Sequence, residues 1–260
     1  MIMRKLLFAV LAATLFSCTD SLKKPYVQHY DYIAHAGGAI GGHIYTNSRE
    51  SLDSALAKGY RFIELDFQFT SDSVLVAAHS WEEFNLWTGF AAYGNEAPTC
   101  GEFTGRRIHG SYTPLTAKDV HAFFMQHEDL YLVTDKISDP ELLAEYFPGL
   151  KERMVVEAFS YEHYRQLRQE GYFRVLYSCM ASDLESALVK NMLLDWMFPG
   201  ERIEWVALHT SGFESGFFKF LYSVCDFRIA LFTVDDLGEI DEEYADRVWM
   251  IYTNRLLPDK

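Results

Sequence analysis

The feature that most constrains the fold of this chain is a regular alternation of short apolar runs with longer segments of helical periodicity. The strand candidates are the runs 32–35, 62–67, 74–79, 130–135, 154–159, 174–178, 205–209, 229–234 and 248–252. The helix candidates between them are 49–58, 116–126, 140–147, 161–170, 182–197 and 216–225. Such alternation is typical of a parallel sheet whose strands are joined by crossover helices. The chain is therefore predicted to be an α/β protein.

A closed barrel fits this pattern better than an open sheet. The candidates 62–67 and 74–79 follow each other without a helix, so one of them is an elaboration on eight strands. A doubly wound sheet would be favoured by a glycine-rich dinucleotide fingerprint after the first strand, and Gly37-Gly38 and Gly41-Gly42 lack that spacing. We expect a single (β/α)8 TIM-type barrel over residues 31–260, with a short loop excursion after the third strand candidate, at 81–112.

The N-terminal residues have the features of an export signal. Arg4 and Lys5 precede an apolar run over 6–16 that is too short to span a bilayer. The run ends in Ser17-Cys18, which resembles the bacterial lipobox; an ordinary secretory signal with an incidental cysteine is the alternative. We expect a lipoprotein signal peptide over 1–17, lipidation of Cys18 and a tether over 18–30. The protein would then be extracytoplasmic and lipid-anchored to a bacterial membrane, on its periplasmic side or at the cell surface.

Charge and cysteine content narrow the classes of partner. The formal net charge of −14 disfavours nucleic acid and anionic lipid surfaces as partners, and it suits a site that holds a cation through carboxylates. Cys100, Cys179 and Cys225 are too irregularly spaced for a zinc motif or a disulfide framework. One disulfide among these three is compatible with an oxidising compartment, and the sequence does not select a pair.

Polar side chains collect at the ends of several predicted strands, where the active site of a parallel barrel forms. These residues are His35, Glu64, Asp66, His79 and Asp135. Glu64 and Asp66 are two positions apart and so face the same side of a strand. Two inward carboxylates repel each other unless a cation or protons intervene, and oxygen ligands of this kind suit Mg²⁺ or Ca²⁺. An edge strand with two solvated acids is the alternative.

Several motifs resemble those of the glycerophosphodiester phosphodiesterase superfamily. They are Ile33-Ala34-His35-Ala36-Gly37-Gly38, Thr46-Asn47-Ser48, Phe62-Ile63-Glu64-Leu65-Asp66, Thr70-Ser71-Asp72, His79, Tyr112-Thr113-Pro114-Leu115-Thr116, Leu231 to Asp235 and Ile251 to Pro258. The resemblance implies a metal-dependent phosphoric diester hydrolase that acts on glycerophosphodiester or phospholipid-derived substrates. It also implies one divalent cation on Glu64, Asp66 and Asp135, and it assigns the roles of acid and base to His35 and His79 without saying which is which.

The sequence departs from the family pattern at the phosphate contact. Ala36 stands where the family has an arginine, Ser80 follows His79 in place of a common aspartate, and Asp135 with Lys136 replaces a glutamate two residues before a lysine. These features look closer to bacterial proteins similar to phosphatidylinositol-specific phospholipase C. Lys136 is a candidate substitute for the arginine. Neighbours on a strand face opposite sides, so either the strand bulges at Lys136 or one of the pair points away from the mouth.

Other candidates and functions stay open. Asn47 and His209 are candidate substrate contacts, although Asn47 could instead cap a helix and His209 could bond a loop. Glu157 faces either the barrel or the helices, and the aromatic residues Trp81, Trp87, Phe90 and Tyr93 form either a satellite core or an apolar wall for a lipid-like substrate. The alternatives to hydrolysis are a phospholipase-like lyase that releases a cyclic phosphate and a catalytically inactive barrel that acts as a binding protein.

Overall fold

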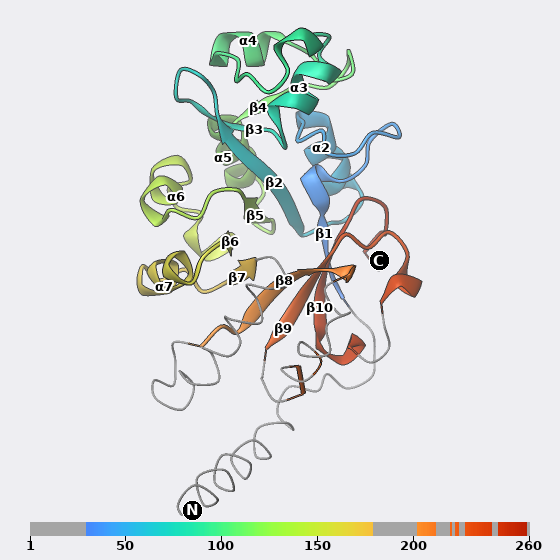
Figure 1. Cartoon of the computed structure of the whole chain (residues 1–260), viewed down its shortest axis with the longest axis vertical. Coiled ribbons are helices and arrows are strands. Elements are labelled where there is room, and N and C mark those ends of the chain that lie inside the picture. Colours follow the sequence, from blue (N-terminus) through green and yellow to red (C-terminus); the bar gives the residue numbers. More distant parts are fainter. Residues whose placement is uncertain are drawn as a thin grey trace, which may run out of the picture.

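Eight parallel strands form a closed barrel in the computed structural model, which describes residues 30–178, 202–211, 219, 222–223, 227–240 and 244–258 (Figure 1). The barrel strands are β1 (Asp31–Ala34), β2 (Phe62–Phe69), β5 (Tyr131–Asp135), β6 (Met154–Ala158), β7 (Val175–Ser178), β8 (Trp205–His209), β9 (Arg228–Phe232) and β10 (Val248–Thr253). The first strand, β1, pairs in parallel with both β10 and β2, and this double pairing closes the ring. The predicted TIM-type barrel is confirmed.

The ninth predicted strand lies outside the ring. It is β3 (Leu75–Ala77), which runs antiparallel to the end of β2 and pairs in turn with β4 (Leu115–Thr116). This extension lengthens one wall of the barrel beyond its rim (Figure 1). The sequence did not predict β4, because two residues are too short to produce a detectable alternation.

Helices cover the outside of the strands, and each begins at a polar cap. The helices between barrel strands are α2 (Arg49–Ala57), α5 (Ala117–Gln126), α6 (Pro140–Tyr146) and α7 (Tyr161–Gln169). Their N-caps are Ser48, Thr116, Asp139 and Ser160, each of which accepts a hydrogen bond from the first turn. The suggestion that Asn47 caps a helix is wrong, because Ser48 and Ser51 form the capping box of α2.

Short 3₁₀ segments complete the described chain. They are η1 (His35–Gly37), η2 (Ala91–Tyr93), η3 (Lys151–Arg153), η5 (Leu237–Glu239) and η6 (Ala245–Arg247). The predicted helix 182–197 and most of the predicted helix 216–225 lie outside the described residues, as do the expected signal peptide, Cys18 and the tether. Within the described ranges, no helix is long and apolar enough to cross a bilayer.

The alternation of side chains along each strand separates an outer core from the barrel interior. Ile63 and Leu65 of β2 pack in the outer core, so Glu64 and Asp66 between and beside them face inward. The interior is filled by a smaller apolar cluster that includes Ile33 of β1. This cluster closes the barrel below the carboxylates, so the polar side chains are confined to one end.

The excursion after β3 is helical and has its own small core. It contains α3 (Trp81–Trp87), η2 and α4 (Cys100–Gly105), and it lies beyond β3 and β4 at the top of Figure 1. Trp81 and Phe84 pack against Phe103 in this core. The satellite-core interpretation therefore holds for Trp81. Cys100 at the start of α4 is a free thiol, and Cys179 and Cys225 lie outside the described residues.

Candidate active site

Three carboxylates from two adjacent strands meet at the barrel mouth. Asp66 of β2 is in register with Asp135 of β5, and Glu64 lies one step deeper on β2. One oxygen from each of these three side chains lies within 4.8 Å of the others. Glu64 and Asp66 are almost completely buried. Buried carboxylates at this spacing need a compensating positive charge or bound protons.

Glu64 has the hydrogen-bonding deficit that a cation would satisfy. Its Oε2 accepts a 2.7 Å bond from the backbone N–H of Ala36, whereas its buried Oε1 has no partner. Burial, followed by the charges of Asp66 and Asp135, raises the pKa of Glu64 well above its usual range. Burial and the neighbouring acids Glu157 and Asp66 raise the pKa of Asp135 to about 8. This all-oxygen donor set fits a hard divalent cation.

Asp66 is held in place by an amide and an ammonium group. Its Oδ2 accepts a 3.0 Å bond from Nδ2 of Asn47, and its backbone N–H donates a 3.1 Å bond to Oδ1 of Asn47. The Lys136 ammonium lies 3.1 Å from its Oδ1. Burial alone would raise the pKa of Asp66, but Lys136, His79 and Asn47 together hold it below its usual value. Because the side-chain nitrogen and oxygen of Asn47 both bond Asp66, Asn47 orients this carboxylate rather than lining the cavity.

The turn at the end of β5 brings both Asp135 and Lys136 to the mouth. Lys136 has a positive φ of 68°, a left-handed conformation that re-aims its side chain after the strand. Its backbone N–H donates a 2.6 Å bond to Oδ1 of Asp135, and its ammonium group also donates to the backbone carbonyl of His79. The adjacent pair is therefore accommodated by a turn, and neither residue points away.

His35 lies at the inner side of the mouth. Its Nδ1 is 3.1 Å from Oγ1 of Thr233, and its Nε2 is 3.9 Å from Oε2 of Glu64. Burial lowers the pKa of His35 to about 4, although the charge of Asp66 opposes this effect. The Tyr45 ring packs edge-on against His35 and also contacts His79, with both pairs of ring centroids 4.7 Å apart. Tyr45 therefore lies between the two imidazoles, which the sequence gave no reason to expect.

His79 lies across the mouth and has its own carboxylate partner. Its Nδ1 is 2.5 Å from Oε2 of Glu83 in the first turn of α3. Ser80 caps this helix and donates a 2.9 Å bond to the same oxygen. Ser80 therefore serves as a helix cap, and Glu83 is the acid that contacts His79. The spacing Ser80-x-x-Glu83 is a helix-start signature that could have revealed the pair in the sequence.

Glu157 of β6 faces the barrel interior and is a fourth acid at the mouth. The Tyr252 hydroxyl donates a 2.5 Å bond to its Oε1, and the Ser178 side chain is a second partner. Burial raises the pKa of Glu157 to about 7, while the bonds from Tyr252 and Ser178 oppose the increase. Glu157 lies outside the three-carboxylate group, so it is a separate polar feature of the cavity.

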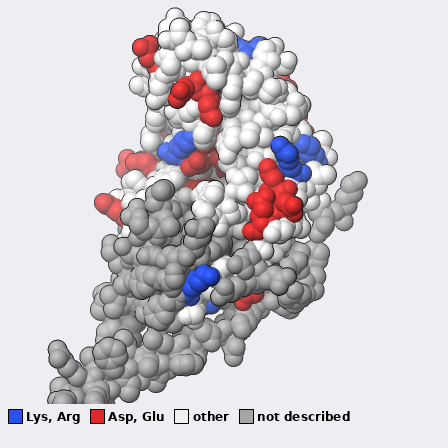
Figure 2. All heavy atoms as spheres, turned by 45° about the vertical axis from the view of Figure 1, so that its right-hand side comes forward, with Lys and Arg blue, Asp and Glu red and all other residues white. Residues whose placement is uncertain are grey.

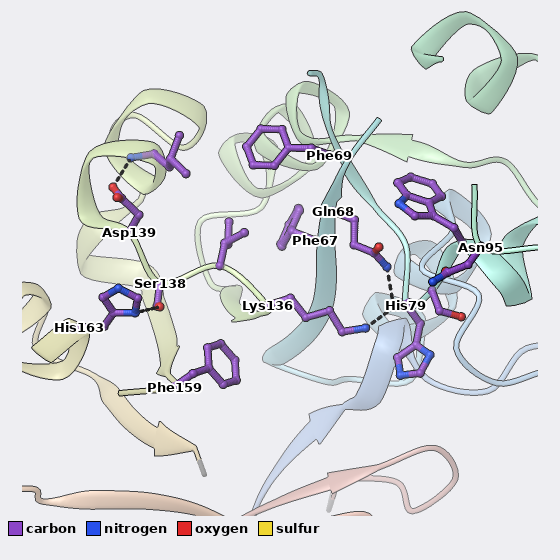
Figure 3. A pocket seen from close by; sticks show the side chains of 14 residues that line it. Phe67, Gln68, Phe69, His79, Asn95, Lys136, Ser138, Asp139, Phe159 and His163 are labelled. Carbon is purple, nitrogen blue, oxygen red and sulfur yellow. Dashed lines mark hydrogen bonds between the residues drawn. The ribbon is translucent and has the colours of Figure 1, made fainter. Parts of the chain in front are cut away.

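Two adjoining cavities open at this end of the barrel. The mouth cavity, about 320 Å³, is lined by His35, Tyr45, Glu64, Asp66, His79, Asp135, Glu157, Phe159, Ser178, His209, Phe232, Thr233 and Tyr252. It thus includes the predicted contact His209, whose Nδ1 lies 2.8 Å from Oγ of Ser211. A larger cavity of about 760 Å³ adjoins it and is shown in Figure 3. His79 and Phe159 line both cavities.

Charge on the surface is distributed in small patches. On the face drawn in Figure 2, the described Lys and Arg side chains form separated patches with acidic side chains beside them. Near the three carboxylates, the Lys136 ammonium supplies a local positive charge, 3.1 Å from Oδ1 of Asp66.

Comparison with known proteins identifies one family. Residues 38–173 match the glycerophosphoryl diester phosphodiesterase family. No curated protein matches the chain significantly. The matched segment includes Glu64, Asp66, His79 and Asp135, and it begins just after His35.

Solved structures share the fold over most of their length. A candidate glycerophosphoryl diester phosphodiesterase of Agrobacterium tumefaciens has 14% sequence identity and a TM-score of 0.64, over 87% of this chain and 94% of that one. A glycerophosphodiester phosphodiesterase of Parabacteroides distasonis has 16% identity and a TM-score of 0.61, over 87% and 93%. A phosphodiesterase of Oleispira antarctica, solved with the product sn-glycerol-3-phosphate, has 15% identity and a TM-score of 0.57, over 86% and 92%. At these identities the likeness concerns the fold.

Proposed function

This chain belongs to the glycerophosphoryl diester phosphodiesterase family, and we propose that it cleaves glycerophosphodiesters at the barrel mouth with one divalent cation and two histidines. Membership makes it a phosphoric diester hydrolase and disfavours the alternative of an inactive binding protein. One observation carries the proposal: the inward carboxylates Glu64, Asp66 and Asp135 converge within 4.8 Å, and His35 and His79 line the same cavity.

The three carboxylates would hold the cation. The unpartnered Oε1 of Glu64 supports this role, because a buried carboxylate oxygen without a donor is otherwise unfavourable. When bound, the cation supplies positive charge next to the phosphate oxygens, where negative charge develops during the reaction. Both Mg²⁺ and Ca²⁺ accept oxygen ligands, so the donor set is compatible with either ion. Asn47 and Lys136 would keep Asp66 ionised and oriented.

The positions of the two histidines suggest their roles. His35 lines the mouth cavity beside Glu64, so it would remove the proton of the substrate hydroxyl that attacks phosphorus. His79 borders both cavities and would donate a proton to the departing alcohol oxygen. Glu83 would hold the His79 imidazole and stabilise its protonated form. The Lys136 ammonium, which borders the adjoining cavity beside Asp66, would contact the phosphate in place of the missing arginine.

A glycerol-containing arm suits the polar mouth cavity. Glu157, Ser178 and Tyr252 offer hydrogen-bonding groups there, and a similarly folded phosphodiesterase was solved with sn-glycerol-3-phosphate as its product. We also propose that Cys18 is lipidated after removal of residues 1–17, which would anchor the enzyme on the extracytoplasmic side of a membrane. Phospholipid headgroups would be available to the enzyme at that location.

Release of choline from glycerophosphocholine, measured with Mg²⁺, Ca²⁺ or EDTA, tests this function. Wild-type protein should turn over with a cation and stop with EDTA. His35→Ala and His79→Ala should each lose about 10²- to 10⁴-fold in kcat, the usual contribution of acid–base catalysis. His121→Ala is the control, because that imidazole lies on α5 away from both cavities and bonds the backbone carbonyl of Pro148. Full activity in either active-site variant would contradict the proposed roles.

A further inference from the structure

The cavity beside the mouth has its own walls and is continuous with the candidate active site. Residues from β2, from the turn after β5, and from the start of α6 line it, and Figure 3 shows them around the Lys136 side chain. It shares His79 and Phe159 with the mouth cavity. We call this second cavity, lined by Phe67, Phe69, Ile137, Leu142 and Phe159 among others, the side groove.

Several polar side chains of the side groove already have partners within the protein. Asp139 accepts backbone bonds from Glu141 and Leu142 at the start of α6, at 2.8 and 3.1 Å. The His163 ring lies 2.9 Å from the Ser138 hydroxyl, and the Gln68 amide donates to two backbone carbonyls. These side chains are therefore partly committed to contacts within the protein.

Two aromatic side chains of the side groove are incompletely covered. Phe69 is 39% exposed and Phe159 is 42% exposed, although both are large aromatic residues. Burying a side chain of this size typically contributes about 1.5–3 kcal/mol, so covering these rings would favour binding of an apolar group.

A phosphodiester has two ester arms, and the two cavities differ in the arm that they suit. The mouth cavity contains four carboxyl groups, from Glu64, Asp66, Asp135 and Glu157, and would reject a hydrocarbon because their hydration would be lost. The side groove has one carboxylate, Asp139, among its lining residues and exposes the rings of Phe69 and Phe159. His79, which would protonate the departing oxygen, lines this groove, so the groove lies next to the arm that departs.

Resting on the proposed function, we propose that the side groove holds the departing alcohol and that this alcohol carries a hydrocarbon chain. The substrate class is then a single-chain lipid with a free glycerol headgroup. The bond that breaks joins phosphorus to the oxygen of the chain-bearing alcohol, which leaves with a proton from His79. The phosphorus stays on glycerol, whose hydroxyl forms the new bond and loses its proton to His35; water then opens the cyclic ester.

The test compares glycerophospho-octanol with glycerophospho-ethanol as substrates. Wild-type protein should prefer the octyl ester by at least about tenfold in kcat/KM, because each buried methylene contributes about 0.8 kcal/mol. Phe69→Asp on β2 and Leu142→Asp on α6 change two different elements of the groove wall and should each reduce this preference about tenfold or more. The matched control is Phe173→Asp, since Phe173 is 66% exposed and does not line the groove. It should keep the octyl preference.

Binding separates failure of this inference from failure of the proposed function. Octyl phosphate and ethyl phosphate are titrated into each variant by calorimetry in the presence of Mg²⁺, which needs no turnover. A tighter octyl ligand that loses its advantage in Phe69→Asp supports the side groove even if neither ester is hydrolysed. An absence of chain-length preference in both assays, or an equal preference in wild type and both groove variants, overturns the inference.

Discussion

The imidazole Nδ1 of His79 lies 2.5 Å from Oε2 of Glu83, four positions later in the first turn of α3. The same carboxylate oxygen accepts a bond from Ser80, the N-cap of that helix. A helix start therefore fixes the orientation of a histidine of the candidate active site. The excursion that contains α3 therefore helps to orient His79, although it lies outside the barrel.

Glu83→Gln should lower kcat on glycerophosphocholine by about 10- to 100-fold, part of the 10²- to 10⁴-fold that acid–base catalysis supplies. Glutamine keeps the size of the side chain but no longer stabilises a protonated His79. Steady-state kinetics of this variant should be compared with those of Glu82→Gln, whose carboxylate is exposed on the same helical turn. Equal kcat values for the two variants would show that Glu83 does not support His79.

Glu64→Gln should abolish stabilisation of the protein by Mg²⁺ or Ca²⁺. A ligand at 100 times its Kd stabilises a folded protein by about 2.7 kcal/mol, which appears as a rise in Tm. The Tm of wild type should rise with the cation and the Tm of Glu64→Gln should not. Glu157→Gln should keep the response, because Glu157 lies outside the three-carboxylate group. A normal cation response in Glu64→Gln would exclude Glu64 as a ligand.

Gly37→Ala should destabilise the turn that carries His35. The new Cβ would lie 2.2 Å from Oγ of Ser51 in α2, and φ is +82° at this position. Overpacking adds about 1–3 kcal/mol to the roughly 1–2 kcal/mol of a left-handed alanine. Gly59→Ala is the matched control, since φ is +87° and no atom lies within 4 Å of its Cβ. Urea denaturation of both variants gives the comparison, and equal losses would exclude the predicted clash.

Glu50→Gln should destabilise the protein by about 1 kcal/mol at pH 7, and the difference should disappear in acid. The Glu50 carboxylate accepts 2.7 and 2.8 Å bonds from the backbone and hydroxyl of Thr113. Burial alone would raise the pKa of Glu50, but these bonds lower it below its ordinary value of 4.5. A lowered folded-state pKa gives stability that is present above pH 4.5 and is lost as the pH falls through the folded-state value.

Denaturation of wild type and Glu50→Gln between pH 3 and pH 7 measures this difference. Glu145→Gln, on the exposed side of α6, should show no comparable effect at any pH. A loss of unfolding free energy in Glu50→Gln that stays constant down to pH 3 would mean that the ionised carboxylate does not stabilise the contact with Thr113.

The inward position of the carboxylates Glu64 and Asp66 was predictable from the sequence for a physical reason. A strand buried on both sides is almost continuously apolar, so Glu64 and Asp66 within the run 62–67 were conspicuous. The parallel pairing of β2 with β5 then places Asp66 beside Asp135, because these two residues are in register.

The features that were missed depend on backbone turns or on closure of the barrel. The left-handed conformation of Lys136 cannot be read from residue types, so its compatibility with Asp135 was uncertain. Glu157 and Tyr252 are 95 positions apart and meet only because β6 and β10 face the same interior. Tyr45 precedes the first helix without any local pattern, yet its ring lies between the two histidines.

Phosphorus NMR of glycerophosphocholine incubated with the enzyme tests the central claim most directly. With Mg²⁺ or Ca²⁺, the phosphodiester signal should be replaced by that of glycerol phosphate, with a cyclic ester as an intermediate. The signal should persist with EDTA and in His35→Ala. A cyclic ester that accumulates without opening would indicate the lyase alternative. An unchanged phosphodiester signal, from folded wild-type protein that binds the cation, would contradict the account.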